Sequence, residues 1–465
     1  MKKIYLDYAA TTPIDPKVLK AMKPYFSAKF GNPSSLHSFG QEAMAAIDES
    51  REKIAKAIGA PPAGGFREII FTGSATEANN LALRGIVKFF GNPQAIVFQN
   101  QNNPAPAAGF SSPSARWPRF AGTKPSAPAG CSSSQYAFGQ KISPLRIIVS
   151  AIEHESILET CRDLEQDGVE IIYLPVNRQG LIDLKKLKES LNERTVLVSI
   201  MYANNEIGTI QNIPKISEII SDFKKEKLKP NTNQLINQLT NYPLFHTDAV
   251  QAFQFLDCDV NKLGINLMTL SAHKIYGPKG IGLLYSRIKN GELRMQNLSS
   301  IITGGGQEFG LRSGTENVPA IVGFAKAVEL AVKNREKESK RIAKLTDYFW
   351  KEIIKIKPKA EINGVSSIKH QILNNRVRLP NILSIYFPNE NAQDLLMKLD
   401  LAGVAISSGS ACSTRSTQPS HVLKAIGLNE KRVKNSLRFS FGKFTTKGEI
   451  NNAIKIIKRI IKKIM

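Results

Sequence analysis

Between residues 68 and 285, short runs of apolar residues alternate with stretches that have helical periodicity. The apolar runs are EIIF (68–71), RIIVS (146–150), VEIIYL (169–174), TVLVSIM (195–201), LMTLS (267–271) and GIGLLY (280–285). The stretches between them include TEANNLALRGIVKFF (76–90) and SILETCRDLEQDG (156–168). Buried strands that alternate with helices form a mostly parallel sheet with helices on both faces, so this pattern predicts an α/β fold.

A second, smaller unit is expected toward the C-terminus. From about residue 320 onward, long amphipathic helices dominate, with strands at NILSIYF (381–387) and near SLRFSFG (436–442). A chain of 465 residues has room for two domains. We therefore predict a large domain over residues 16–334 and a small α+β domain that combines residues 1–15 with residues 335–465.

Two polar segments interrupt the large domain. Residues 91–144 contain eight prolines and no Asp or Glu, and much of this run is Pro, Ala, Gly and Ser. Such a composition buries too little apolar surface to offset the entropy of ordering, so it predicts a disordered surface insertion at about 100–141. The stretch KKEKLKPNTNQLINQLTN (224–241) predicts a second surface insertion, although its Leu and Ile spacing also fits a short helix.

The chain is strongly basic. Its formal net charge is +24, and basic residues gather in VKNREKESKRIAK (332–344) and IKIIKRIIKKIM (454–465). Nucleic acid or an acidic protein is one interpretation of this charge. Lys, Ile and Asn are abundant through most of the chain, however, and both basic runs fit the exposed faces of amphipathic helices. Because no aromatic interleaving accompanies the charge, we do not expect direct binding of nucleic acid.

Apolar content and cysteine usage indicate the compartment. No run approaches the roughly 18 apolar residues of a membrane span, and MKKIYLDYAA lacks the apolar stretch of a signal peptide. The four cysteines form no CxxC pair, which argues against a disulfide framework and a cysteine-rich zinc site: Cys131, Cys161, Cys258 and Cys412. We expect a cytoplasmic protein in a reducing compartment, without membrane association.

A lysine follows the strand expected at residues 267–271. The sequence continues as AHKIYGPKG, which places Ser271, His273 and Lys274 together at the end of this strand. An amine beside a hydroxyl and an imidazole suits an aldehyde cofactor whose phosphate needs donors nearby, namely pyridoxal 5'-phosphate held as a Schiff base. Taken alone, a surface lysine in a turn is the simpler interpretation of Lys274.

Two further stretches bring polar groups to the ends of strands. YPLFHTDAVQAF (242–253) delivers Asp248, a carboxylate able to keep a pyridine nitrogen protonated. In FTGSATEANN (71–80), a strand leads into a helix through Ser74 and Thr76, whose hydroxyls and backbone N–H groups form a cradle for phosphate. Considered singly, each stretch also fits an ordinary loop or helix cap.

His154 in SAIEHESI and Asn205 in MYANNEIGT also follow strands. The His154 imidazole is placed to stack on a flat ring or to move protons, although a lone loop histidine is more often structural. Flanking Glu153 and Glu155 suggest a metal, but no second histidine stands at ligand spacing, so we expect no metal site. An open α/β sheet places its ligand site at the carboxyl ends of its strands, where all these residues fall.

Cys412 lies in ISSGSACSTRS (406–416), among small and polar residues. A cysteine that serves packing usually has apolar neighbours, whereas this composition is typical of an exposed, mobile loop. The stretch therefore indicates a thiol that is kept for its chemistry.

With these residues assembled, the chain resembles the cysteine desulfurases of the NifS/IscS group, in class V of the aminotransferase-like enzymes that use pyridoxal phosphate. The resemblance extends over nearly the whole chain, through YLDYAATTPIDP, FGNPSSLHSFGQEA, ATEANNLAL, EHESI, NNEIGTIQ, HTDAVQA, SAHKIYGPKG, GGGQEFGLRSGTENVP, SSGSACSTRS and LRFSFGKFT. The chain departs from the family at Gly73-Ser74, where Ser-Gly is more usual, and in its two insertions.

The resemblance implies pyridoxal-phosphate fold type I with a seven-stranded sheet, and a homodimer. It makes Lys274 the Schiff-base lysine and Cys412 the nucleophile that carries a persulfide. It also implies that Asp248 pairs with the ring nitrogen, and that His154 lies over the ring with Asn205 and Gln251 near the ring hydroxyl. Arg438 would bind the substrate carboxylate. The residues that would hold the phosphate are Ala75, Thr76, Ser271 and His273, together with Thr315 of the other subunit.

The activity that the resemblance implies is conversion of L-cysteine to L-alanine, with sulfur passed through Cys412 to an acceptor. An iron–sulfur scaffold protein and a tRNA-thiolation relay are the expected kinds of acceptor. Two alternatives remain open at this point. A selenocysteine lyase would share nearly every cofactor residue but depend less on Cys412, and a sulfur-transfer scaffold without catalysis would act through protein binding.

Overall fold

The computed structural model describes residues 3–60, 65–91, 144–227, 242–287, 298–365, 377–409 and 419–464. Its centre is a seven-stranded sheet in the order β2-β8-β7-β6-β5-β3-β4. The strands are β2 (Ile69–Thr72), β8 (Gly282–Ser286), β7 (Leu267–Ser271), β6 (Leu244–Asp248), β5 (Thr195–Ser199), β3 (Arg146–Ser150) and β4 (Glu170–Leu174). Only the pairings of β8 are antiparallel, which confirms the predicted mostly parallel sheet.

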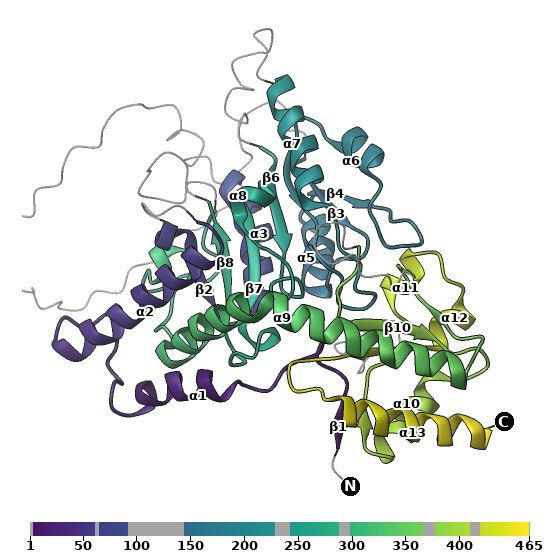
Figure 1. The fold of residues 1–465 in the computed structure, drawn as a ribbon. Helices are drawn as coiled ribbons and strands as arrows, with labels where there is room; N and C mark the ends of the chain where they lie inside the picture. The colour runs from purple at the N-terminus through teal and green to yellow at the C-terminus, as the bar shows by residue number, and fades with distance from the viewer. Residues whose placement is uncertain are drawn as a thin grey trace, which may run out of the picture.

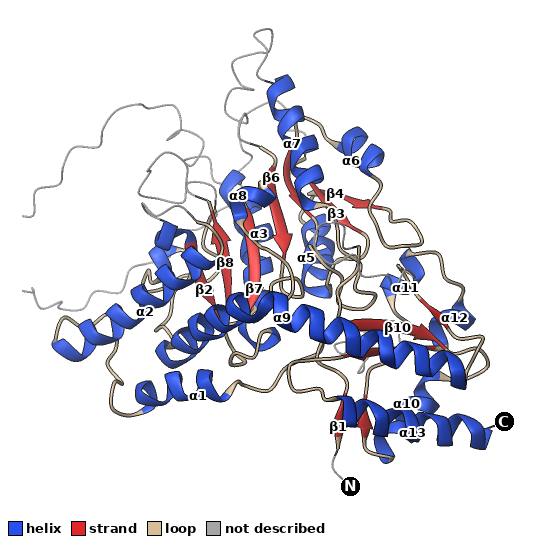
Figure 2. Ribbon diagram, viewed as in Figure 1, coloured by secondary structure: helices blue, strands red, loops and turns tan. Residues whose placement is uncertain are grey.

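Helices cover both faces of this sheet (Figure 2). Along β3, Ile147 and Val149 point into one apolar core while Ile148 points into the other, as the period of two along a strand requires. One face packs against α3 (Ala75–Phe90) and α5 (Glu155–Gln166). The opposite face packs against α2 (Ser38–Ala57), α7 (Ile213–Lys227), α8 (Val260–Leu263) and α9 (Val318–Ile356).

A second region contains the C-terminal strands and both chain ends (Figure 1). Its sheet has the antiparallel order β12-β10-β9, and β1 pairs with β11 beside it. The elements are β1 (Ile4–Tyr5), β9 (Glu361–Ile362), β10 (Ile382–Tyr386), β11 (Val404–Ala405), β12 (Ser436–Ser440), α10 (Ala392–Leu401), α11 (His421–Ala425), α12 (Glu430–Lys434) and α13 (Lys447–Ile464). The strands at β10 and β12 lie where the sequence predicted them.

Helix α9 joins the two regions, because it runs from the large sheet to the C-terminal strands (Figure 1). Near its end, Phe349 packs against Phe439 of β12 and against Phe441. The predicted boundary between residues 334 and 335 therefore falls inside a continuous helix. The remaining helices are α1 (Pro16–Met22) and α6 (Leu184–Ser190).

The structure describes part of one predicted insertion and none of the other. The segment at about 100–141 lies outside the described residues. Helix α7 continues through Lys227, so the first residues of the 224–241 stretch are helical and the rest lies outside the description. No helix in the described part of the chain has both the length and the apolar character that a membrane span needs.

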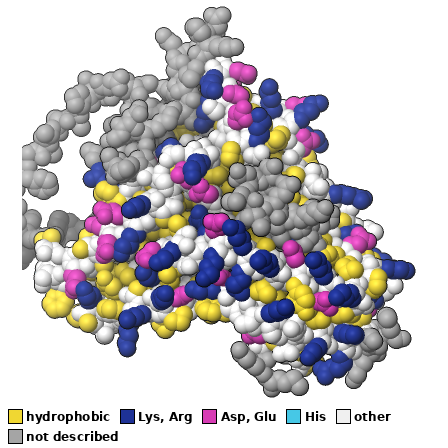
Figure 3. Space-filling model, viewed as in Figure 1, with side chains coloured by type: hydrophobic (Ala, Val, Ile, Leu, Met, Phe, Trp, Pro, Cys, Tyr) yellow, Lys and Arg dark blue, Asp and Glu magenta, His cyan; other side chains and the backbone are white. Residues whose placement is uncertain are grey.

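On the face of the molecule drawn in Figure 3, the described basic residues are spread out and form no single stripe. On the face drawn in Figure 3, Lys and Arg side chains lie among acidic, apolar and neutral ones. Many of the exposed lysines pair with a carboxylate three or four positions away on the same helix, as Lys340 does with Glu336 and Lys434 does with Glu430. This mixture is typical of a solvated helical surface.

Candidate active site

The carboxyl ends of β2, β3, β5, β6 and β7 meet at one pocket. Asp248 is the last residue of β6, and Lys274 ends the short turn that follows β7. The predicted site residues that line this pocket are Ala75, Thr76, His154, Asn205, Asp248, Gln251, Ser271, His273, Lys274 and Arg438. Parallel strands bring residues distant in sequence to one edge of a sheet, which explains why these motifs converge.

The amine of Lys274 is held at the pocket by the N-terminal segment. Its Nζ donates hydrogen bonds to the carbonyls of Ala9 and Ala10, each at 2.7 Å. The side-chain Nε2 of Gln251 donates to the same Ala9 carbonyl at 3.0 Å. Ala9 and Ala10 were not predicted as site residues, although they belong to the YLDYAATT motif.

Asp248 presents a carboxylate that is buried and held at both oxygens. Its side chain accepts from the backbone N–H of Val250 at 3.0 Å through Oδ1. It also accepts from the amide Nδ2 of Asn79 at 3.0 Å through Oδ2. Two donors orient the carboxylate at the end of β6, where the sequence predicted a partner for a ring nitrogen.

His154 is the N-cap of α5, and its ring also lines the pocket. The ring nitrogen Nδ1 accepts from the backbone N–H of Ser156 at 3.1 Å. Burial lowers the pKa of His154, an effect that nearby Asp248 opposes and Lys274 reinforces. The imidazole is therefore neutral near pH 7.

The opposite end of the pocket offers donors for an anion. Ser74 is the N-cap of α3, and its Oγ accepts from the backbone N–H of Glu77 at 3.1 Å, which explains a serine at this position. Ala75 and Thr76 begin this helix and line the pocket, and the N–H groups of a first helical turn have no partner within their own helix. A Cβ on Gly282 of β8 would lie 2.6 Å from the backbone nitrogen of Ala75, so the strand passes close behind this helix end.

Arg438 reaches the pocket from β12 of the second region. Its guanidinium donates to the carboxylate of Asp7 at 2.9 Å and to the carbonyl of Asn205 at 2.9 Å. The side chain is only 2% exposed, and its Nε has no hydrogen-bond partner among the described residues. A buried guanidinium with a donor to spare suits a carboxylate ligand.

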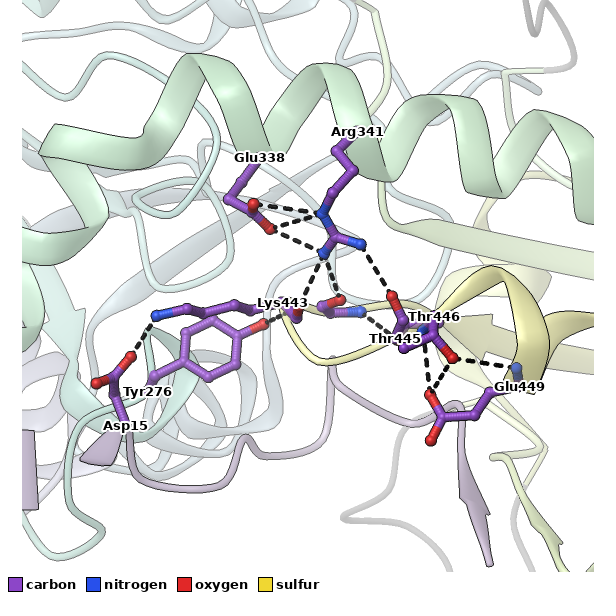
Figure 4. A network of polar contacts seen from close by, with 9 residues as sticks. Asp15, Tyr276, Glu338, Arg341, Lys443, Thr445, Thr446 and Glu449 are labelled. Carbon is purple, nitrogen blue, oxygen red and sulfur yellow. Dashed lines mark hydrogen bonds and ion pairs between the residues drawn. The ribbon is translucent and has the colours of Figure 1, made fainter. Parts of the chain in front are cut away.

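A network of polar contacts fixes β12 relative to the Lys274 turn (Figure 4). Tyr276, two residues after Lys274, accepts a hydrogen bond through its hydroxyl from the backbone N–H of Lys443. Arg341 of α9 donates to the backbone carbonyls of Gly442, Lys443 and Thr445. The Lys443 ammonium also pairs with Asp15, just after the N-terminal segment that holds Lys274. These contacts join the loop that follows β12 to Tyr276, two residues after Lys274, and to Asp15.

The structure does not describe two predicted site residues at this pocket. Thr315 lines a separate cavity with Arg312 and Glu316, and does not reach the Lys274 pocket within this chain. Cys412 falls in the segment 410–418, which is outside the described residues. The chain enters and leaves this segment near Glu206, whose carboxylate accepts from the hydroxyl of Ser420 at 2.5 Å.

The two described cysteines are poor nucleophiles. Cys161 and Cys258 are buried, and burial raises the pKa of each thiol to about 12. Thiolate is the reactive form, so neither side chain is suited to attack sulfur near neutral pH. Within the described ranges, no group of three or more His, Cys, Asp or Glu side chains is arranged to hold a metal ion.

The residues present fit pyridoxal phosphate. A primary amine at Lys274, a carboxylate at Asp248 and a helix N-terminus at Ala75 and Thr76 supply, in one pocket, the partners for an aldehyde, a ring nitrogen and a phosphate. The neutral ring of His154 lines the same cavity, and the unpartnered Nε of Arg438 leaves a donor for an amino-acid carboxylate. The donor set therefore matches the cofactor and its substrate class together.

Comparison with known proteins agrees with this donor set. The chain belongs to the aminotransferase class-V family, whose model matches residues 4–108, 139–228 and 230–452. Within that family it is 39% identical over 463 residues to a protein named cysteine desulfurase IscS from Dictyoglomus turgidum, covering 100% of this chain and 95% of the relative.

Two solved structures are also similar to this chain in sequence and fold. The NifS-like protein from Rickettsia africae has a TM-score of 0.72 and 31% identity, covering 99% of both chains. The structure titled SspA in complex with cysteine has a TM-score of 0.66 and 31% identity, covering 95% of this chain and 100% of that one. These similarities confirm the family that the sequence motifs predicted.

Proposed function

We propose that this protein is a pyridoxal-phosphate-dependent cysteine desulfurase, which converts L-cysteine to L-alanine and transfers the sulfur to Cys412. The observation that carries the proposal is the single pocket that contains the Lys274 amine, the Asp248 carboxylate and the Arg438 guanidinium. Its relative in family and fold, SspA, has a structure in complex with cysteine. The overall reaction balances as L-cysteine plus a Cys412 thiol giving L-alanine plus a Cys412 persulfide.

When bound, pyridoxal phosphate supplies an electron sink that makes the Cα proton of an amino acid removable. Arg438 binds the substrate carboxylate through its fork of N–H groups and so orients Cα toward Lys274. The Lys274 amine, released from the Ala9 and Ala10 carbonyls, moves that proton. The Cys412 thiolate then attacks the substrate sulfur, a sulfur–sulfur bond forms, and the bond between sulfur and carbon breaks.

His154 has a separate task. Its ring is neutral, and its Nδ1 accepts a hydrogen bond, so the proton of the ring is on Nε2. We assign to the imidazole ring the stacking contact with the cofactor ring, and to its Nε2 a role in proton transfer during alanine release. Ala75, Thr76, Ser271 and His273 hold the phosphate, and Asn205 and Gln251 lie beside the ring hydroxyl in this proposal.

A homodimer completes the proposal. Apolar side chains on the connection between α1 and α2 and at the start of α2 are exposed, among them Phe26, Phe30, Leu36 and Phe39. Exposed aromatic side chains in this number favour an interface. We infer that a second copy covers them, and that Thr315 of each subunit reaches the phosphate site of the other. Sedimentation of the purified protein should give twice the chain mass, and Thr315→Ala should weaken cofactor binding.

The proposed sulfur acceptors are iron–sulfur scaffold proteins or other acceptor proteins, and the proposed compartment is the reducing cytoplasm, where a working thiol persists. The test is to incubate the purified protein with pyridoxal phosphate and L-cysteine, and to measure alanine and sulfide. A visible absorption band and steady alanine formation are expected, and their absence would leave a scaffold without catalysis. Faster turnover of selenocysteine than of cysteine would instead favour a selenocysteine lyase.

A further inference from the structure

A buried chain of side chains connects Asp248 to His154 behind the pocket. Asn79, on the inner face of α3, is fully buried, and its amide nitrogen lies 3.0 Å from Asp248 Oδ2 and 2.8 Å from Ser156 Oγ. The Ser156 hydroxyl lies 2.9 Å from His154 Nδ1. Neither Asn79 nor Ser156 was predicted from the sequence, because neither follows directly on a strand end.

The direction of each hydrogen bond in this chain is determined by chemistry. A carboxylate only accepts, so the Asn79 group beside Asp248 must be the amide nitrogen. The amide oxygen of Asn79 is buried without a hydrogen-bond partner among the described residues, which shows that the two acceptors set its orientation. Because Asn79 donates to the Ser156 hydroxyl, that hydroxyl has its own proton free to donate to His154 Nδ1.

We infer that Asn79 and Ser156 are positioning residues that form a relay between Asp248 and His154. The Asp248 carboxylate orients the Asn79 amide, and the amide orients the Ser156 hydroxyl. The hydroxyl in turn holds the His154 ring with its proton on Nε2. The backbone N–H of Ser156 supports the same tautomer, because it also donates to Nδ1. The relay holds Asp248 and His154, which the proposed function places at the ring nitrogen and over the ring, in a fixed relation to each other. It refines the proposed function, since both ends belong to the proposed cofactor site.

Charges that face His154 from the surrounding elements act alongside the relay. They are Asp248 of β6, Lys274 after β7, Glu155 of α5 and His421 of α11. The two carboxylates favour a protonated ring and the two bases oppose it, while burial lowers the pKa of His154. A hydroxyl donor to Nδ1 stabilises the neutral ring, so removing that donor should raise the pKa of His154.

The first measurement determines which ring nitrogen of His154 carries the proton, and it does not require turnover of cysteine. Protein labelled with ¹⁵N-histidine has six histidines, and the His154 resonances are identified by their loss in His154→Gln. In the cofactor-free and the cofactor-loaded protein at neutral pH, we expect Nδ1 of His154 to be unprotonated and Nε2 to carry the proton. A proton on Nδ1 would overturn the relay, whether or not the protein turns over cysteine.

The second measurement is a double-mutant cycle on the pKa of His154. Ser156→Ala should raise that pKa by about 0.5 to 1 unit, because a donor to the neutral ring is lost while the backbone donor remains. In an Asn79→Leu background the hydroxyl is no longer oriented, so the same substitution should shift the pKa by less than about half as much. Equal shifts in the two backgrounds would mean that Asn79 and Ser156 act independently, and would overturn the relay.

Matched variants separate the relay from general structural damage. Asn80→Leu replaces the neighbouring asparagine, whose amide bonds the Thr76 carbonyl and Arg84 on the exposed side of α3, and should leave the His154 pKa unchanged. Ser156→Thr keeps a hydroxyl and should restore the wild-type pKa. With cysteine, Asn79→Leu should lower kcat by about tenfold to a hundredfold with little change in KM. Failure of wild-type turnover alone would count against the proposed function, not against the relay.

Discussion

The two sheets contribute to the pocket in different ways. The seven-stranded sheet supplies groups from the carboxyl ends of successive parallel strands, with Asp248, Lys274 and His154 as the principal examples. The three-stranded sheet supplies one group, Arg438, from the middle of β12, where it pairs in register with Ser384 of β10. In the proposed function, the groups that hold the cofactor and move the proton come from the large sheet, and the group that binds the substrate carboxylate comes from the small sheet.

Substitution of Lys274 should have the largest effect on turnover of cysteine. Lys274→Ala removes the amine at the pocket, so turnover of cysteine should fall by roughly 10³-fold or more. The fold should persist, because the amine lies at the pocket and the Ala9 and Ala10 carbonyls that it bonds belong to backbone that other contacts also hold. Loss of the lysine-linked absorption band checks the assignment. Lys279→Ala, at an exposed position five residues on, is the control, and loss of the band there would move the attachment site.

The small sheet should affect binding more than chemistry. Arg438→Lys keeps the charge but loses the forked donor geometry, so KM for cysteine should rise by about tenfold to a hundredfold with a smaller change in kcat. Steady-state kinetics over a range of cysteine concentrations measures both constants. Arg432→Lys, which alters a guanidinium that pairs with Glu361 in the same region, should change neither. A fall in kcat alone for Arg438→Lys would contradict the proposed division of roles between the two sheets.

Acid should lower the free energy of unfolding, because the buried His246 of β6 in the large sheet resists protonation. Its ring is enclosed between Ser199 of β5 and Thr269 of β7, and burial lowers the pKa of His246 to about 3. The unfolded chain takes up this proton near pH 6.5, so stability should fall below that pH by up to about 1.4 kcal/mol per pH unit.

His246→Gln tests this pH dependence. The variant should be less stable at pH 7, because it disturbs the two cross-strand hydrogen bonds. Its free energy of unfolding should nevertheless decline less steeply than that of the wild type between pH 6 and pH 4. Chemical denaturation across this range measures the slopes, and parallel slopes would show that His246 is not the group responsible.

The smallest effect is expected from the segment at about 100–141, for which the sequence predicts a surface insertion. Replacing residues 100–141 by a short flexible linker should leave desulfurase activity within about twofold of the wild type, because the cost of closing a surface loop varies slowly with its length. The assay is alanine formation under the same conditions. Loss of cofactor binding in this deletion would place the segment against the pocket.

The fold was predictable because short continuous apolar runs that alternate with helices are buried most readily in a parallel sheet covered on both faces. The strands expected at 146–150 and 267–271 are β3 and β7 without any change of boundary. The helix expected at 76–90 differs from α3 by one residue. The C-terminal end of α7 was harder to place, because the lysine-rich sequence after residue 223 fits both a helix and a surface insertion.

The candidate site was predictable where its residues follow strands, and less so elsewhere. Asn79 and Asn80 are adjacent in the ATEANN motif, and only the rotation of α3 decides that Asn79 faces Asp248. Asp7 pairs with Arg438 across 431 positions of sequence, a contact that no local pattern indicates. Sequence motifs thus predicted most of the side chains that line the pocket, whereas the side chains that orient them depend on tertiary packing.

In the proposed mechanism, sulfur from cysteine is stored on Cys412, and the most direct test is the mass of the Cys412 peptide after a single turnover. The protein is loaded with pyridoxal phosphate, mixed with one equivalent of L-cysteine and digested, while released alanine is measured in parallel. We predict one added sulfur atom on the Cys412 peptide and one alanine per sulfur, with both lost in Cys412→Ser because a hydroxyl cannot hold a persulfide. The Cys161 and Cys258 peptides should stay unmodified. Alanine formation at the wild-type rate by Cys412→Ser, or added sulfur on another cysteine, would contradict the account.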